Sequence, residues 1–217
     1  MIPHILDIRA YLWIGLFFLL SIPGLLLGQN QKNADSLIQV YNAGEHSVEV
    51  KFELLRQIAY TSTKTTDKLL YANESIKLAQ EYKNDNWLMR GYMQKGNALR
   101  LKGDLEGAID AYFKSAAAAK RIDYQPGMGG AYLSIGATYA NGNDHRKAIN
   151  FRNRAIGILR AASDSLGLAT ALLNTGYGYY MIDELDSALT LYAESKRIFE
   201  IKEKKKQTPA PEKPVKR

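Results

Sequence analysis

Apolar and polar positions repeat along this chain with a period of 40 residues, from about residue 47 to residue 203. Within each period the apolar residues stand three and four positions apart, which is the spacing of one face of an amphipathic helix. Equivalent positions of a first helix carry Phe52, Tyr92, Tyr132 and Leu172, and those of a second helix carry Leu69, Ile109, Ile149 and Leu189. Each period therefore predicts two helices.

Short polar segments separate the two helices of a unit. They are residues 102–104 (KGD), 141–144 (NGND) and 182–184 (IDE). Gly and Asn readily end helices, and Asp at the start of the next helix accepts hydrogen bonds from its free backbone amides. The segments therefore predict tight turns, so that each unit is a helical hairpin.

Small residues recur where the two helices of a hairpin should meet. They are Gly96, Gly136 and Gly176, each followed twelve residues later by an alanine, namely Ala108, Ala148 and Ala188. A larger side chain there would force the helices apart, and such overpacking costs about 1–3 kcal/mol. The first unit is weaker, because Arg56 and Lys68 stand at these two positions.

A fixed period of this size predicts stacked hairpins rather than a closed globule. We expect an all-α chain folded as an α-α superhelix. Its four units should lie at about residues 47–82, 83–122, 123–162 and 163–203. Residues 29–46 predict a short capping helix on the first unit, because the end of a solenoid otherwise exposes its stacking surface.

The repeated motifs resemble the tetratricopeptide repeat, whose pattern is Leu-Gly-x2-Tyr followed by Ala-x3-Phe. Residues 135–139 (IGATY) match the first half, and residues 108–112 (AIDAY) and 188–192 (ALTLY) match the second. The period is 40 rather than 34 residues, as in tetratricopeptide regions of bacterial sensor and regulator proteins. Arg152 departs from the pattern by replacing the aromatic residue of the third unit, with Phe151 beside it as a substitute.

The resemblance implies a protein or peptide partner held in a concave groove lined by the first helices. By analogy, the groove-facing residues are Gln94, Asn97, Leu101, Ser134, Asn141, Asn174, Tyr177 and Met181. Amides and hydroxyls with a few apolar anchors suit an extended peptide. The alternative is an ordinary solvated surface. The groove subtype that grips C-terminal carboxylates is excluded, because Gly130 and Ser134 stand where its Lys or Arg would be.

The distribution of charge along the chain argues against a nucleic-acid partner. The formal net charge of the 217 residues is +7, but residues 202–217 alone hold seven Lys or Arg against two Glu. Nucleic-acid binding needs a basic stripe on the fold itself, so we expect no nucleic-acid partner. The absence of cysteine excludes a disulfide framework and a lipoprotein attachment site.

Neither catalysis nor a cofactor or metal is predicted. Beyond residue 28 the only histidines are His46 and His145, and no carboxylates group around either of them as a zinc site would require. The segments 127–130 and 176–178 are not phosphate loops, since neither follows a predicted strand. No motif of hydrolases or metalloproteases occurs. We therefore expect a protein that is not an enzyme.

The first 28 residues contain an apolar run from Tyr11 to Gly28, preceded by Arg9 and followed by polar residues. We interpret residues 1–28 as a cleaved signal peptide ending at Gly28. The alternative is an uncleaved membrane anchor, since the run is just long enough to span a bilayer. Either reading predicts an exported protein of the periplasm or envelope, with the membrane contacted only through this segment.

The other end of the chain combines an apolar stripe with a polar tail. Ile198, Phe199 and Ile201 continue the last helix with no fifth unit to cover them. Either the preceding hairpin shields this stripe, or the stripe docks a partner or a second copy and makes a homodimer. Residues 204–217 are rich in Lys and Pro, which predicts a disordered tail.

The favoured function is an exported, non-catalytic scaffold that holds a protein or peptide segment in its groove. One alternative is an extracytoplasmic input component of a bacterial signalling system, as the resemblance to sensor proteins implies. A lesser alternative is a small-ligand or glycan binder that uses concave aromatic rings, since the chain contains 14 tyrosines.

Overall fold

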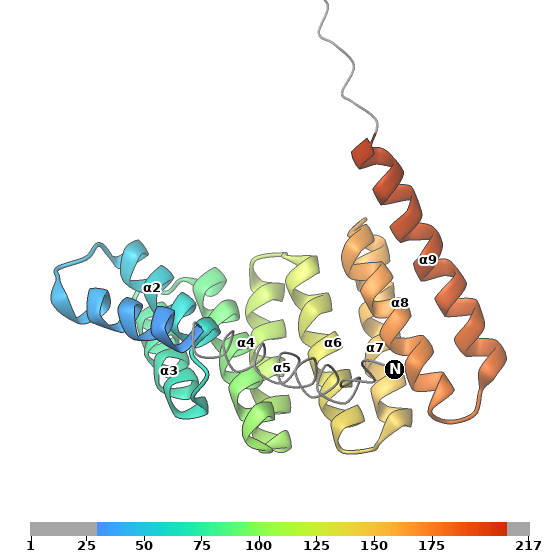
Figure 1. The fold of residues 1–217 in the computed structure, drawn as a ribbon, viewed down its shortest axis with the longest axis horizontal. Helices are drawn as coiled ribbons and strands as arrows, with labels where there is room; N and C mark the ends of the chain where they lie inside the picture. Colours follow the sequence, from blue (N-terminus) through green and yellow to red (C-terminus); the bar gives the residue numbers. More distant parts are fainter. Residues whose placement is uncertain (1–29, 208–217) are drawn as a thin grey trace, which may run out of the picture.

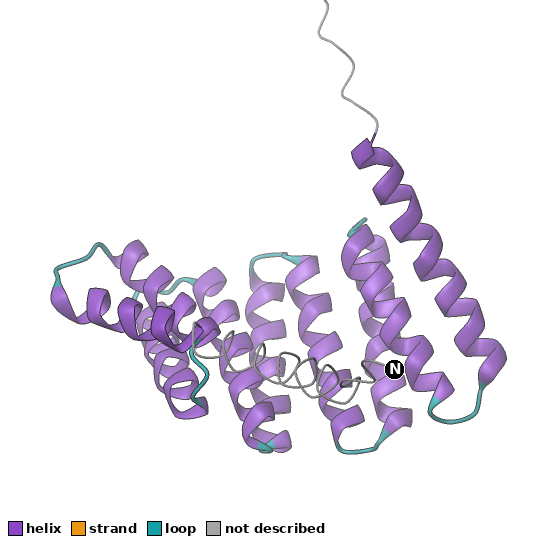
Figure 2. Ribbon diagram, viewed as in Figure 1, coloured by secondary structure: helices purple, strands orange, loops and turns teal. Residues whose placement is uncertain are grey.

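The computed structural model describes residues 30–207, and every regular element in that range is a helix (Figure 1, Figure 2). A helix over residues 30–43 comes first. Four hairpins follow: α2 (Val48–Thr61) with α3 (Thr65–Glu81), α4 (Asp85–Lys102) with α5 (Leu105–Arg121), α6 (Gln125–Asn141) with α7 (His145–Ala161), and α8 (Ser165–Tyr180) with α9 (Leu185–Gln207). The predicted all-α chain of hairpins is confirmed.

One type of turn ends every helix from α3 to α8. A residue with positive φ occurs every 20 positions, at Lys83, Gly103, Asp123, Asn143, Ser163 and Asp183. Its amide bonds to the carbonyl three residues back, and the next amide bonds to the carbonyl five residues back. These bonds satisfy carbonyls that the end of a helix leaves free. The turns therefore repeat every 20 residues, whereas the side-chain pattern repeats every 40.

Aspartates start the helices that follow three of these turns. Asp104, Asp144 and Asp164 each accept a hydrogen bond from the amide three residues later, at 2.9–3.0 Å. The carboxylate thereby satisfies a free amide and faces the positive end of the helix dipole. Tight turns and capped starts together make consecutive helices antiparallel neighbours.

The hairpins stack into a curved row. Contacts between helices two apart join α2 with α4, α4 with α6, and α6 with α8. Among α3, α5, α7 and α9, which lie wholly in the described range, no equivalent contact occurs. The first helices of the hairpins are therefore closer together, on the inner side of the curve (Figure 1). This arrangement confirms the predicted α-α superhelix.

Inside the last three hairpins, a glycine of the first helix faces a side chain sixteen residues later in the second helix. The pairs are Gly96 with Tyr112, Gly136 with Arg152, and Gly176 with Tyr192. A Cβ on these glycines would lie only 2.5–2.8 Å from the facing side chain. Ala108, Ala148 and Ala188 are buried at the same contacts. The large residues at 112, 152 and 192 therefore depend on the absence of a side chain opposite them.

Arg152 is a charged residue among the buried side chains of the described range, whose other buried polar members are serines and threonines. It is 6% exposed, and burial lowers its pKa. Its Nη1 donates to the carbonyl oxygen of Asn174 at 2.7 Å. The aliphatic stem lies against Gly136, where neighbouring units place a tyrosine ring. Phe151 does not replace that ring as the sequence suggested, because it stacks on Tyr139 with the ring centroids 5.3 Å apart.

The helix over residues 30–43 covers the first hairpin, in blue in Figure 1. Leu37, Ile38 and Tyr41 pack on a buried cluster that includes Leu55 and Tyr71. The two tyrosine rings of this contact meet edge to face at 6.2 Å. The Gln31 side-chain oxygen also accepts hydrogen bonds from the amide and hydroxyl of Thr63, at 2.8 and 2.6 Å. The N-terminal end of the described solenoid is therefore closed.

At the other end, α9 continues to Gln207 and rises past α8 (Figure 1). The predicted disordered tail over 204–217 is therefore wrong for residues 204–207, because Lys and Glu are good helix formers that extend the helix. The rest of that tail and the predicted signal peptide over 1–28 lie outside the described residues. Within 30–207 no helix has the length and apolarity needed to cross a membrane.

Candidate partner-binding groove

Three first helices form a hollow of about 180 Å³ on the inner side of the curve. Arg56 comes from α2, and Gly127 and Gly130 come from α6. The remaining residues lie on α4 and are Met89, Arg90, Met93 and Gln94. Apolar thioethers and a few polar groups converging on one concave space are typical of a binding site.

The hollow exists because α6 has no side chains on this face of its first two turns. Gly127 and Gly130 are three residues apart and so share one side of the helix. A Cβ added at Gly130 would meet no atom within 4 Å. The glycine is therefore not required by packing, and any larger residue there would extend into open space.

Two arginines line the hollow, and they differ in their hydrogen-bond partners. Arg56 donates two hydrogen bonds to the Glu53 carboxylate, from Nε at 2.8 Å and from Nη2 at 2.5 Å. These bonds lower the pKa of Glu53 to about 2, so the pair stays ionised at neutral pH. Arg90 Nε donates to the neutral amide of Asn86 at 3.2 Å, and the charge of Arg90 contributes to the lowered pKa of Glu53 without forming an ion pair with it. Arg90 is therefore the cation best placed to attract an acidic group.

Two of the groove residues expected from sequence lie at or beside this hollow. Gln94 lines it directly. Ser134 lies at the contact between α4 and α6, where its hydroxyl approaches Met93 Sδ at 3.7 Å and donates to the carbonyl of Gly130 at 3.0 Å. The first helices of adjacent hairpins thus bring these polar groups together with methionines.

Asn97 has a different role from the expected one. Its Oδ1 accepts a hydrogen bond at 2.8 Å from the hydroxyl of Tyr112, a side chain that is fully buried. A buried phenol needs such an acceptor, and the desolvation that makes it necessary also raises the pKa of Tyr112. Asn97 is therefore held by the interior of its own hairpin.

The other expected groove residues are exposed but do not line the hollow. They are Leu101, Asn141, Asn174, Tyr177 and Met181. Asn174 is linked to the interior through its backbone, since its carbonyl receives the Arg152 hydrogen bond. The ring of Tyr177 lies 6.3 Å from that of Tyr180 on the surface of α8. These residues are spread along the row of first helices and the turns that follow them, away from the hollow.

Sequence reasoning did not identify most of the hollow, namely Arg56, Met89, Arg90, Met93 and Gly127. A usable signal was present. Arg90, Met93 and Gln94 have helical spacing on one face, and Gly127 and Gly130 are glycines at i and i+3 in a helix that does not need both for packing.

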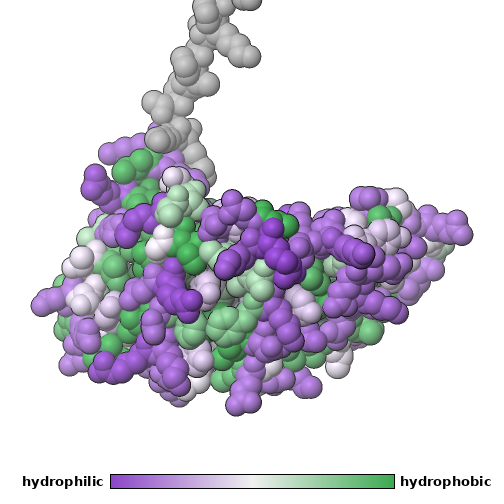
Figure 3. Space-filling model, turned by 180° about the vertical axis from the view of Figure 1, so that it is seen from behind, coloured by the Kyte–Doolittle hydropathy of each residue, from purple (hydrophilic) through white to green (hydrophobic). Residues whose placement is uncertain are grey.

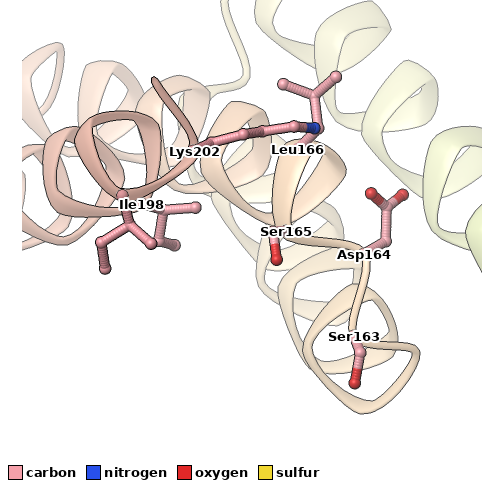
Figure 4. Close-up of a pocket in the computed structure, with 7 residues that line it drawn as sticks. Ser163, Asp164, Ser165, Leu166, Ile198 and Lys202 are labelled. Atoms are coloured by element: carbon pink, nitrogen blue, oxygen red, sulfur yellow. The ribbon is translucent and has the colours of Figure 1, made fainter. Parts of the chain in front are cut away.

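Two further features of the described part of the chain bear on what it could bind. No group of three or more His, Cys, Asp and Glu residues that could hold a metal occurs within it. A larger cavity, of about 460 Å³, lies between the start of α8 and the end of α9, lined by residues such as Leu166, Ile198 and Lys202 (Figure 4). On the face shown in Figure 3, green apolar and purple polar side chains are interspersed.

Known structures share this fold. The apo form of RapI aligns with 80% of this chain and 67% of its own, at a TM-score of 0.67 and 20% identity. A Rap protein complexed with competence and sporulation factor aligns with 71% of this chain but only 44% of its own, at 0.65 and 16%. A putative kinesin light chain from Podosopora anserina with nearly identical TPR-like repeats aligns with 84% of this chain and 90% of its own, at 0.61 and 12%.

At these identities the likeness concerns the fold alone. No family model and no curated protein sequence matches this chain. The stacked hairpins, the inner row of first helices and the aligned structures together show that the chain has the α-α superhelical fold of tetratricopeptide-like repeat proteins.

Proposed function

We propose that this protein is a non-catalytic scaffold that holds a protein or peptide segment on the inner side of its superhelix. The observation that carries the proposal is the hollow between α2, α4 and α6, which Gly127 and Gly130 leave open. Packing against Met89 and Tyr124 accounts for the glycine at 127, but no neighbouring atom requires the glycine at 130. A solenoid that keeps such a space on its concave surface is suited to receiving a side chain from a partner.

The lining of the hollow favours a particular kind of segment. Met89 and Met93 offer flexible apolar surface to an aliphatic or aromatic side chain. Gln94 can bond to the backbone of an extended chain, and Arg90 can pair with a neighbouring carboxylate. The preferred partner therefore has an apolar anchor residue beside an acidic one.

The Rap protein whose structure was solved in a complex supports the proposal by its fold. That protein was crystallised with competence and sporulation factor, so a superhelix of this kind can hold a binding partner. The chain matched here corresponds to less than half of that protein, so the likeness supports the mode of action and not the identity of the partner.

The binding test uses two glycines that both accept a larger side chain. Gly130→Phe fills the hollow, whereas Gly157→Phe adds the same ring at an exposed position of α7 that also has no atom within 4 Å of a Cβ. We expect wild type and Gly157→Phe to recover the same partner from native envelopes, and Gly130→Phe to lose it. Equal recovery by all three proteins, with equal melting temperatures, would reject the hollow as the binding site.

We also propose that the scaffold is exported, because residues 11–28 have the composition of a signal segment. N-terminal sequencing of the protein from a fractionated native cell should give a mature chain that begins at Gln29 in the exported fraction. Recovery of the intact chain from the cytoplasm would reject this part of the proposal and leave the binding proposal untouched.

A further inference from the structure

The second helix of an internal hairpin uses one face to receive the next hairpin. In α7 the residues of this face are Ile149, Arg152, Ile156 and Leu159. None of them is more than 7% exposed, because α8 packs against α7. A core cluster joins the two helices there, with Leu159 beside Leu168 and Leu172. Stacking thus buries this face completely in the middle of the row.

The equivalent face of α9, 40 residues later, is open. It consists of Leu189, Tyr192, Lys196 and Phe199, which we call the C-terminal stacking face. Leu189 is 65% exposed, and the aromatic rings of Tyr192 and Phe199 are only partly buried. From α8, Leu173 is 46% exposed, whereas Leu133, its counterpart in α6, packs on the core cluster formed by α7 and α8.

Of the apolar stripe expected from sequence, Phe199 belongs to this face, and Ile198 and Ile201 lie beside it. Ile198 packs against the α7–α8 core cluster, and Ile201 is 45% exposed. Both line the 460 Å³ cavity between α8 and α9, together with Leu166 (Figure 4). The stacking face and the cavity form an unfinished end of the solenoid, at which exposed leucines and isoleucines favour contact with another apolar surface.

Three features limit what can cover this end. The opposite end is closed by the helix over 30–43, so copies cannot stack head to tail. The stacking face has apolar residues on both sides of Lys196, so two copies of the face can bring apolar side chains into contact. The start of α9 and its preceding turn are acidic, with Asp183, Glu184 and Asp186, while towards its other end Lys202 and Lys204 stand on either side of Glu203.

We propose that a second copy of this chain covers the C-terminal stacking face, related by a two-fold axis that makes the two α9 helices antiparallel. That orientation places the acidic start of each α9 near Lys202 and Lys204 of the other, and Leu189 of each near Phe199 of the other. A two-fold contact closes at two copies, which fits the described solenoid over residues 30–207, where the helix over 30–43 covers one end and the C-terminal stacking face is open at the other. The dimer would present two grooves, so a partner with two binding segments would be held more tightly.

Cross-linking tests the contact cleanly because the chain contains no cysteine. Ala193→Cys places a single thiol at an exposed site in the middle of α9, and Asn73→Cys places one at an exposed site on α3. With a short bis-maleimide added to native envelopes that contain the protein, we expect a dimer from Ala193→Cys and none from Asn73→Cys. Equal cross-linking at the two sites, or none at either, would overturn the proposal, as would a product containing a foreign protein instead of a second copy.

Two second substitutions in the Ala193→Cys protein distinguish a specific interface from non-specific association. Adding Leu189→Glu should lower the Ala193→Cys dimer at least about tenfold, because the contact would bury an unpaired carboxylate. Adding Leu70→Glu, at an exposed leucine of α3, should leave it unchanged. Both positions are more than half exposed, so circular dichroism should show both variants folded. A dimer that survives Leu189→Glu would contradict the assignment of the face.

Charge reversal tests the antiparallel orientation. One variant carries Glu184→Lys and Asp186→Lys, and the other carries Lys202→Glu and Lys204→Glu, each with Ala193→Cys. Each variant alone places like charges at both ends of the contact and should dimerise less than wild type. Their mixture restores opposite charges at both ends and should form a mixed dimer. A mixture that cross-links no better than its components would rule out this orientation.

Discussion

The hairpin α6–α7 and the hairpin α8–α9 repeat one sequence pattern, but their equivalent faces have different environments. Ile149 is 7% exposed, whereas Leu189, 40 residues later, is 65% exposed. Both are large aliphatic residues at the same position of a second helix. What differs is the neighbour, since α8 covers α7 and no described helix follows α9. In a solenoid, the position in the row therefore decides whether an apolar residue belongs to a core or to a surface.

The largest expected difference between the two hairpins concerns this residue pair. Ile149→Ala should lower the free energy of unfolding by about 2–4 kcal/mol, because it leaves a cavity between α7 and α8. Leu189→Ala should change it by less than about 0.5 kcal/mol in the monomer. Urea unfolding at high dilution measures both. Equal losses would show that α9 is covered in the monomer, which would break the comparison.

The glycines at the hairpin contacts should show a smaller contrast. Gly96→Ala forces a methyl group against Tyr112, which is fully buried, and should cost about 1–3 kcal/mol. In the last hairpin, Gly176→Ala meets Tyr192, whose ring is only partly buried and can move outward, so its cost should lie below that range. Gly157→Ala is the control, because helix propensity alone should make it stabilising. A Gly176→Ala cost as large as that of Gly96→Ala would indicate a covered Tyr192.

The closed N-terminal end depends on a smaller set of bonds. Gln31→Ala removes the acceptor for the amide and hydroxyl of Thr63 and should cost about 1 kcal/mol. Hydrogen exchange should speed up over residues 30–43 and stay unchanged in α9. Faster exchange throughout the solenoid would mean that this helix stabilises more than the first hairpin.

The turns should give the smallest effect. Ser163 has φ 56°, a left-handed conformation that a glycine adopts with less strain, so Ser163→Gly should stabilise by up to about 1 kcal/mol. Gly103→Ala reverses the change at the equivalent turn three helices earlier, at φ 88°, and should destabilise by about the same amount. Thermal unfolding of the two variants compares them directly. A shift in the same direction for both would contradict the shared turn geometry.

The helices and their stacking could be predicted from sequence because both follow from local, repeated patterns. Helical spacing, Gly and Asp at the turns and small residues at the contacts each act within about 20 residues, and three units carried them in one register. The 20-residue repeat of the turns was not predicted, because Lys, Asp and Ser at positions 83, 123 and 163 rarely adopt a positive φ and so do not indicate one in a sequence. The helix over residues 204–207 was not predicted, because these residues were grouped with the Pro-rich segment that follows them.

The hollow was harder to predict because it depends on three helices from different units and on side chains that are absent. Analogy selected polar residues of the first helices by their spacing, and Gln94 lies in the hollow. Asn97 lies three residues further along α4, but its Oδ1 accepts a hydrogen bond from the buried hydroxyl of Tyr112. That hydroxyl needs an acceptor only once the hairpin has folded and buried it. Arg90 and Met93 become site residues only because Gly130, 40 residues from Arg90, leaves room opposite them.

The most direct test of the proposed groove is a photo-cross-linking amino acid placed at Gln94, which lines the hollow, and separately at Gly157 on the exposed face of α7. After illumination of native envelopes, mass spectrometry of the products identifies what each position contacts. We expect the probe at 94 to capture one protein through a segment that contains an apolar residue beside an acidic one, and the probe at 157 not to capture it. Capture of that protein only from position 157, or from neither position, would contradict a partner bound on the inner side of the superhelix.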